Sequence, residues 1–174
     1  GLSIFQDDRG VGLAVSCDAI GFWLTRARQF GITTQGPAQE FGEPVLRLKD
    51  PDGIIVNLIG VEDLSVFNAK PWTGESIPEE FAVVALRSGT ILTEKPAETI
   101  AFLTENFGLE RGAVEGSQPR LTSATGGVVD VRDATGFWTA APGTGTMDHN
   151  APNAPDAAPL LRSAERPVWQ ASRP

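Results

Sequence analysis

The sequence repeats itself, and this internal repeat constrains the fold more than any other feature. The phrase "RQFGI" at 28–32 returns as "ENFGL" at 105–109, and "GIIVN" at 53–57 returns as "GVVD" at 127–130. In each half, the first phrase ends a predicted helix and the second lies in a predicted strand. One strand–helix–strand–strand–strand unit used twice is the simplest architecture that explains both matches.

The first half contains the elements of one such unit. Strands are predicted at 2–7 and 11–17, and an alternating strand "EPVLRLKD" meets the apolar run "IIVNLIGV" through the tight turn "DPDG". Between them we expect a helix that Asp18 caps and Gly31 ends. Its inward stripe has helical spacing and comprises Ile20, Trp23, Leu24 and Ala27.

The second half supplies the same elements. A strand is predicted within "FAVVALRSGTILTE", and Pro96 is well placed in the first turn of the following helix. Gly108 ends this helix, and its inward stripe comprises Ile100, Leu103 and Phe107. Three short strands are then predicted in "RGAVEG", "PRLTSATG" and "GVVDVRDA".

These elements predict an α+β fold in which paired βαβββ units form a curved mixed sheet. We expect one compact domain, with Phe67 and Trp72 attaching the linker to it. The predicted parts are a first unit at 1–61, a linker at 62–80, a second unit at 81–147 and an Ala/Pro-rich tail at 148–174.

Composition excludes several classes of function. The net charge is −8, whereas nucleic-acid binding needs clustered Lys and Arg. No segment approaches the roughly 18 continuous apolar residues that a membrane span needs. We therefore expect a cytoplasmic protein without a nucleic-acid or membrane partner. The single histidine, His149, means that no metal site within one chain can use two histidines.

The stretch "FWLTRARQFGITTQGPAQEFGEPVLRLKDPDGIIVNLIG" resembles the vicinal oxygen chelate (glyoxalase/bleomycin-resistance/dioxygenase) superfamily. That family has a "FW..RL...G" helix before a "FGE…L.F.DPDG…EL" phrase. The later phrases "ALRSGTI", "TIAFLTENFGL", "VVDVRD" and "GTMDHNAP" follow the order seen in its ring-cleaving dioxygenases of the hydroquinone and catechol type. The resemblance covers most of residues 11–152.

This resemblance implies sheets that form a cup around Fe(II) or Mn(II), held by two His and one Glu. Three protein ligands on one side of a metal leave room for a diol substrate and for O₂. His149 matches one ligand position, but Arg87 stands where the family has the His of "GLH". Asn57 stands where it has the Glu after "DPDG", and Asp130, at the repeat-equivalent position, keeps a carboxylate. The chain thus resembles two middle units of a four-unit dioxygenase with an incomplete metal site.

Candidate site residues have alternative interpretations. His149 and Asp130 are candidate metal ligands, or else surface residues. Asn57 and Arg87 are candidate pocket residues, one binding a ligand through its amide and the other holding an anion. Asn57 could instead tie neighbouring strands, and Arg87 could extend from the sheet edge to solvent. Two aromatic residues could wall a pocket or anchor a core or a dimer interface: Phe137 and Trp138.

Two functions of different class follow. The first is a ring-cleaving dioxygenase that acts on a dihydroxylated aromatic with Fe(II) or Mn(II), although the sequence assigns no catalytic residue. The second is a metal-free module that binds or sequesters a small aromatic or drug-like molecule. In either case we expect a homodimer, because curved sheets leave edges and faces to cover.

Overall fold

A computed structural model describes residues 10–74 and 76–136 of the protein. The predicted strand at 2–7 and everything after residue 136 lie outside this described part. The elements are β1 (Gly10–Ser16), α1 (Ala19–Gln29), β2 (Thr33–Glu40), β3 (Glu43–Lys49), β4 (Ile55–Val61), the 3₁₀ turns η1 (Leu64–Phe67) and η2 (Glu79–Phe81), β5 (Ala85–Thr93), α2 (Pro96–Phe107), β6 (Glu110–Glu115), β7 (Gln118–Thr122) and β8 (Val128–Asp133).

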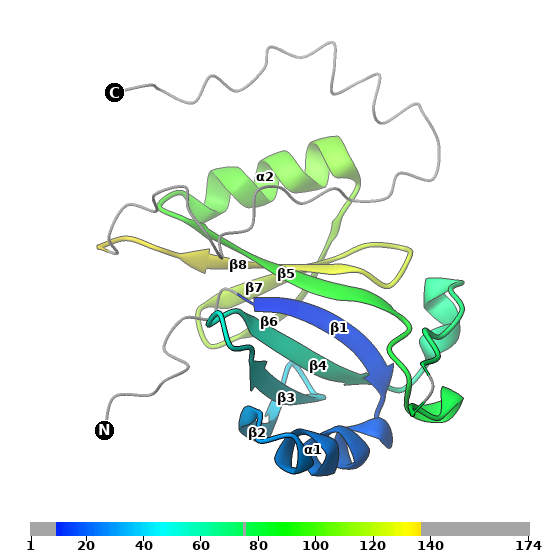
Figure 1. The fold of residues 1–174 in the computed structure, drawn as a ribbon. Coiled ribbons are helices and arrows are strands. Elements are labelled where there is room, and N and C mark those ends of the chain that lie inside the picture. Colours follow the sequence, from blue (N-terminus) through cyan, green and yellow to red (C-terminus); the bar gives the residue numbers. More distant parts are fainter. Residues whose placement is uncertain (1–9, 75, 137–174) are drawn as a thin grey trace.

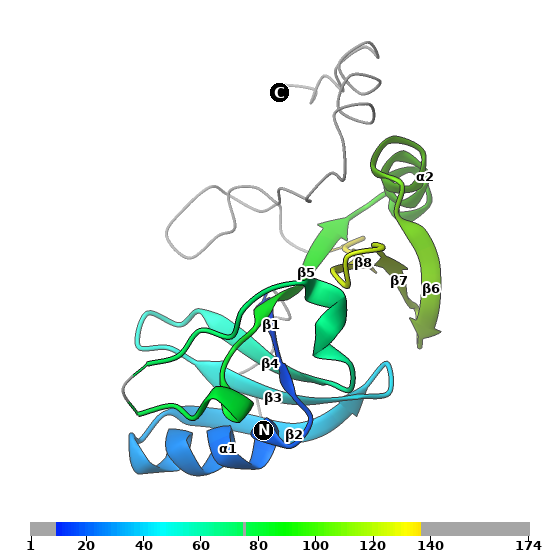
Figure 2. The same ribbon diagram turned by 90° about the vertical axis from the view of Figure 1, so that its right-hand side faces the viewer.

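The two units share one eight-stranded sheet with the order β2-β3-β4-β1-β5-β8-β7-β6. In each unit the first strand runs parallel to the last, so β1 pairs with β4 and β5 pairs with β8. The units join where β1 and β5 pair antiparallel at the centre of the sheet. The sheet curls strongly, as Figure 2 shows, and brings its two ends toward each other. The predicted α+β fold of paired βαβββ units is confirmed.

Each helix covers the outer face of its own unit (Figure 1). Ile20 of α1 packs into a core with Leu46 and Leu58, and Ile100 of α2 packs into a second core. The predicted inward position of Phe107 is wrong, because its side chain remains 37% exposed at the end of α2 and meets Phe102 edge-on. Neither helix of the described residues is long and apolar enough to span a membrane.

The two ends of α1 differ in how they are closed. Asp18 makes no side-chain capping bond, since its φ of −69° and ψ of −20° place it in the helical region rather than in an extended one. The predicted Asp18 cap is therefore wrong. Gly31 does end the helix, with φ +66°. Its N–H donates to the Arg28 carbonyl and that of Ile32 donates to the Ala27 carbonyl, which is the Schellman arrangement.

The linker crosses the inner face of the sheet through η1. Phe67 packs there against a third apolar cluster that includes Val45 and Ile59, so it attaches the linker as expected. Trp72 does so only through its backbone, whose N–H donates to the Val83 carbonyl, while its side chain is 64% exposed.

Two glycines of one segment provide a matched test of this local structure. At both Gly21 and Gly31, no atom lies within 4 Å of the place that a Cβ would take, so a substitution acts through the backbone alone. Gly31→Ala should lower the free energy of unfolding by about 1 kcal/mol, because φ is positive there. Gly21→Ala, inside α1, should raise it by about 0.5–1 kcal/mol. Urea unfolding measures the free-energy change of each variant. Equal effects of the two substitutions would contradict a Schellman motif at the C-terminus of α1.

Candidate inner-face site

A pocket of about 180 Å³ lies on the inner face of the curled sheet. Seven of the eight strands contribute to it, including the two edge strands, which only a curled sheet can bring to one pocket. Its lining comprises Glu40, Phe41, Val45, Arg47, Asn57, Ile59, Ser88, Thr90, Glu115, Gln118, Arg120 and Asp130.

The pocket is closed on one side where two hairpin tips meet. Glu40 and Glu43 flank the loop Phe41–Gly42, and both loop residues have positive φ, +50° and +79°. This is the geometry of a tight hairpin turn that suits the twist of the strands, although Phe41 is a bulky residue for such a conformation. The Phe41 N–H donates to Glu115 Oε2 at 2.7 Å on the β6–β7 hairpin of the other unit.

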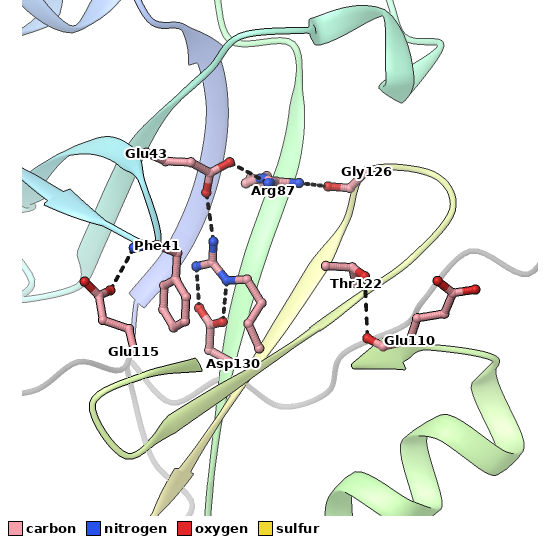
Figure 3. Close-up of polar contacts among 9 residues, drawn as sticks. Phe41, Glu43, Arg87, Glu110, Glu115, Thr122, Gly126 and Asp130 are labelled. Atoms are coloured by element: carbon pink, nitrogen blue, oxygen red, sulfur yellow. Dashed lines mark hydrogen bonds and ion pairs between the residues drawn. The ribbon is translucent and has the colours of Figure 1, made fainter. Parts of the chain in front are cut away.

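The guanidinium of Arg120 lies between the carboxylates of Asp130 and Glu43, whose side chains point toward each other beside Phe41 in Figure 3. Its Nε and Nη2 donate to the two carboxylate oxygens of Asp130 at 2.7 and 2.9 Å, and Nη1 donates to Glu43 Oε2 at 2.8 Å. The ring of Phe41 covers the guanidinium at 3.8 Å. Both Arg120 and Asp130 are buried, at 7% and 6% exposure. This is a bidentate, charge-assisted pair with a third anionic partner.

Glu43 extends the network to a second cation. Its other oxygen accepts from Arg87 Nη2 at 2.5 Å, and Arg87 Nη1 donates to the Gly126 carbonyl. Arg87 is the extra residue of a β-bulge, because Gly12 pairs with Ser88 while Leu13 pairs with Leu86. Bulges redirect side chains, which explains how Arg87 reaches Glu43.

The surroundings of Arg120 keep it charged. Burial alone would lower its pKa, but the hydrogen bonds and negative charges of Asp130 and Glu43 outweigh burial and raise the pKa of Arg120 above its ordinary value.

Asn57 occupies the place in unit one that Asp130 occupies in unit two. In the strand register, Asn57 of β4 lies opposite Arg47 of β3, and Asp130 of β8 lies opposite Arg120 of β7. This register confirms the equivalence that the repeat implies. The two sites differ in their bonds. Arg47 forms an ion pair with Glu40, and Asn57 Oδ1 is buried with no hydrogen-bond partner among residues 10–74 and 76–136. The first unit therefore presents an unused acceptor where the second has a closed ion pair.

The structure brings three of the predicted site residues together. Asn57 and Asp130 line the pocket, and Arg87 joins Asp130 through Glu43 and Arg120. His149, Phe137 and Trp138 lie outside the described residues.

Sequence reasoning missed three members of this site: Phe41, Glu43 and Arg120. The repeat carried a signal for Arg120, since an arginine stands opposite both Asn57 and Asp130. The signal becomes visible only when the strand register is known.

The inner face does not fit a metal ion. Both oxygens of Asp130 and both of Glu43 already accept from guanidinium nitrogens. The unused oxygen of Asn57 is an amide, a poor ligand for a transition metal beside carboxylate or imidazole. Across residues 10–74 and 76–136, no group of three or more His, Cys, Asp and Glu side chains could hold a metal. A metal in this protein would need ligands from outside the described part.

Comparison with known proteins yields two curated relatives from Bacillus subtilis strain 168, MhqO and MhqE, each named as a proposed ring-cleaving dioxygenase. The chain is 30% identical to MhqO over 140 residues, which cover 79% of this chain and 43% of MhqO. It is 29% identical to MhqE over 123 residues, which cover 70% of this chain and 39% of MhqE. The chain thus spans less than half the length of these relatives. No model of a known protein family matches it.

A solved structure agrees with these relatives. The crystal structure of a proposed dioxygenase from Bacillus subtilis superimposes with a TM-score of 0.62 at 29% identity, covering 71% of this chain and 39% of that one. The likeness therefore extends from sequence to fold over most of the chain.

Proposed function

Because the chain belongs to the vicinal oxygen chelate (glyoxalase/bleomycin-resistance/dioxygenase) superfamily, we propose that it forms part of a ring-cleaving dioxygenase that acts on a dihydroxylated aromatic compound. The observation that carries this proposal is the 30% identity to MhqO over 79% of the chain. Sequence identity does not specify a substrate, so the proposed class of substrate rests on the names of the relatives alone.

Within such an enzyme, we assign the described units a supporting role. The ion pairs of Arg120 and Arg87 hold their inner face, and both oxygens of Asp130 and of Glu43 already accept from these guanidinium groups. Fe(II) or Mn(II), the metals of the family, would need ligands from outside the described residues. His149 remains the proposed ligand there.

Metal content and oxygen consumption of the purified protein test this proposal together. We expect stoichiometric Fe or Mn by elemental analysis, and O₂ uptake when hydroquinone or catechol is added. His149→Ala should lose both, whereas Asn150→Ala, a substitution in the adjacent residue, should retain both. A metal-free protein that consumes no O₂ with either diol would rule out the enzyme.

A second function, metal-free binding of a small molecule, is favoured by one specific observation. The buried Oδ1 of Asn57 has no hydrogen-bond partner in the described part of the chain, and an unpaired buried acceptor costs about 1–3 kcal/mol. A ligand hydroxyl could donate to it, with the hydroxyl side chains of Ser88 and Thr90 on the same lining. The pocket of about 180 Å³ is smaller than the 300–1,000 Å³ typical of drug-sized ligands. The structure therefore favours a single-ring, neutral ligand.

Titration of the protein with hydroquinone under anaerobic conditions, followed by NMR, tests this second function. Asn57→Leu removes the acceptor and should weaken binding by about tenfold, the equivalent of one hydrogen bond of about 1.4 kcal/mol. Gln29→Leu, on the exposed end of α1, should leave the affinity unchanged. Equal affinities of the wild type and Asn57→Leu would contradict a role of this amide in binding.

A further inference from the structure

We propose that the guanidinium of Arg120 is a built-in cation of the inner face, which joins carboxylates of both units and excludes a divalent metal from the place between them. This proposal concerns the described residues alone and does not depend on the activity of the whole protein.

All three nitrogens of the Arg120 guanidinium bind carboxylate oxygen, at 2.7, 2.9 and 2.8 Å. One flat side of the guanidinium faces the Phe41 ring at 3.8 Å, and the residue is 7% exposed. A planar fork that is satisfied at each nitrogen and removed from water is among the strongest arrangements available to arginine. A metal could reach these carboxylates only by displacing it.

Asp130 and Glu43 carry two negative charges, and Arg120 and Arg87 carry two positive charges, so the network is neutral. A divalent cation added to it would bring two positive charges next to two guanidinium groups at distances where like charges repel strongly. The four residues of this network therefore have no excess negative charge of their own to attract such an ion.

Asp130 and Arg120 belong to the second unit and Glu43 to the first, and Glu43 and Arg120 are separated by 77 positions in the sequence. Beside this bond, the Phe41 N–H of the first unit donates to Glu115 of the second. Arg120 thus connects the two units at the hairpin tips, as a bound metal would by taking ligands from both.

Titration with Mn²⁺ tests the proposal, because this paramagnetic ion broadens the NMR signals of nearby nuclei. The full chain is labelled with ¹⁵N, treated with a chelator, exchanged into buffer and titrated to one equivalent. We expect the Ser88 and Asp130 amide signals to broaden no more in the wild type than in Asp130→Asn, because no Mn²⁺ binds at Asp130. Broadening that Asp130→Asn does abolish would overturn the proposal.

Substitution of Arg120 gives the complementary test. Arg120→Ala leaves Asp130 and Glu43 facing each other, and we expect at least tenfold tighter Mn²⁺ binding that is lost again in Arg120→Ala/Asp130→Asn. A folded Arg120→Ala that gains no Mn²⁺ binding would show that the guanidinium does not exclude the metal. If Arg120→Ala does not fold, Arg120→Met keeps most of the packing of the arginine stem and is used with the same two criteria.

Discussion

The three-way bond of Arg120 with Asp130 and Glu43 is the central contact between the two ends of the curled sheet. Strand pairing between β1 and β5 joins the units at the middle of the sheet. Away from this pairing, Glu43 of the first unit accepts from Arg120 and Arg87 of the second, and Phe41 covers the Arg120 guanidinium. Breaking one partner of a buried pair typically costs about 3–5 kcal/mol, because it leaves an uncompensated charge.

This network also explains why the described residues have the fold of a metal-dependent family and yet an inner face that does not fit a metal ion. The two units have the fold of their superfamily and are 30% identical to MhqO over 140 residues. Asp130 and Glu43, however, are bound to Arg120, and Glu43 connects the two units through it. Among the described residues, the buried Asn57 Oδ1 is an acceptor with no hydrogen-bond partner. The same fold can therefore supply a supporting pair of units without metal chemistry of its own.

Much of the fold was predictable because its signals are local. The Asp-Pro-Asp-Gly turn, Pro96 at the start of α2 and Gly31 after α1 each act through the backbone of a few neighbouring residues. Asp18 failed as a cap for a local reason too, since its backbone is already helical. The repeat then extended these local signals to a two-unit architecture.

The site was less predictable because it depends on long-range geometry. Asp130 and Asn57 could be matched through the repeat, but their partners could not. Arg120 meets Glu43 only after the sheet has curled, and Arg87 reaches it only because a bulge redirects its side chain. Neither the curl nor the bulge has a sequence signal that can be read without the strand register.

The central claim is that Arg120 couples the two units through Glu43, and a double-mutant cycle measures this coupling directly. The free energy of unfolding is determined for the wild type, Glu43→Gln, Arg120→Met and the double variant. The account predicts a coupling energy of about 1.5–3 kcal/mol, as for contacting residues in one network. The same cycle on the exposed pair Lys95–Glu98, with side chains 68% and 70% exposed, should give about 0.5 kcal/mol or less. A coupling between Glu43 and Arg120 no larger than that of the exposed pair would contradict the account.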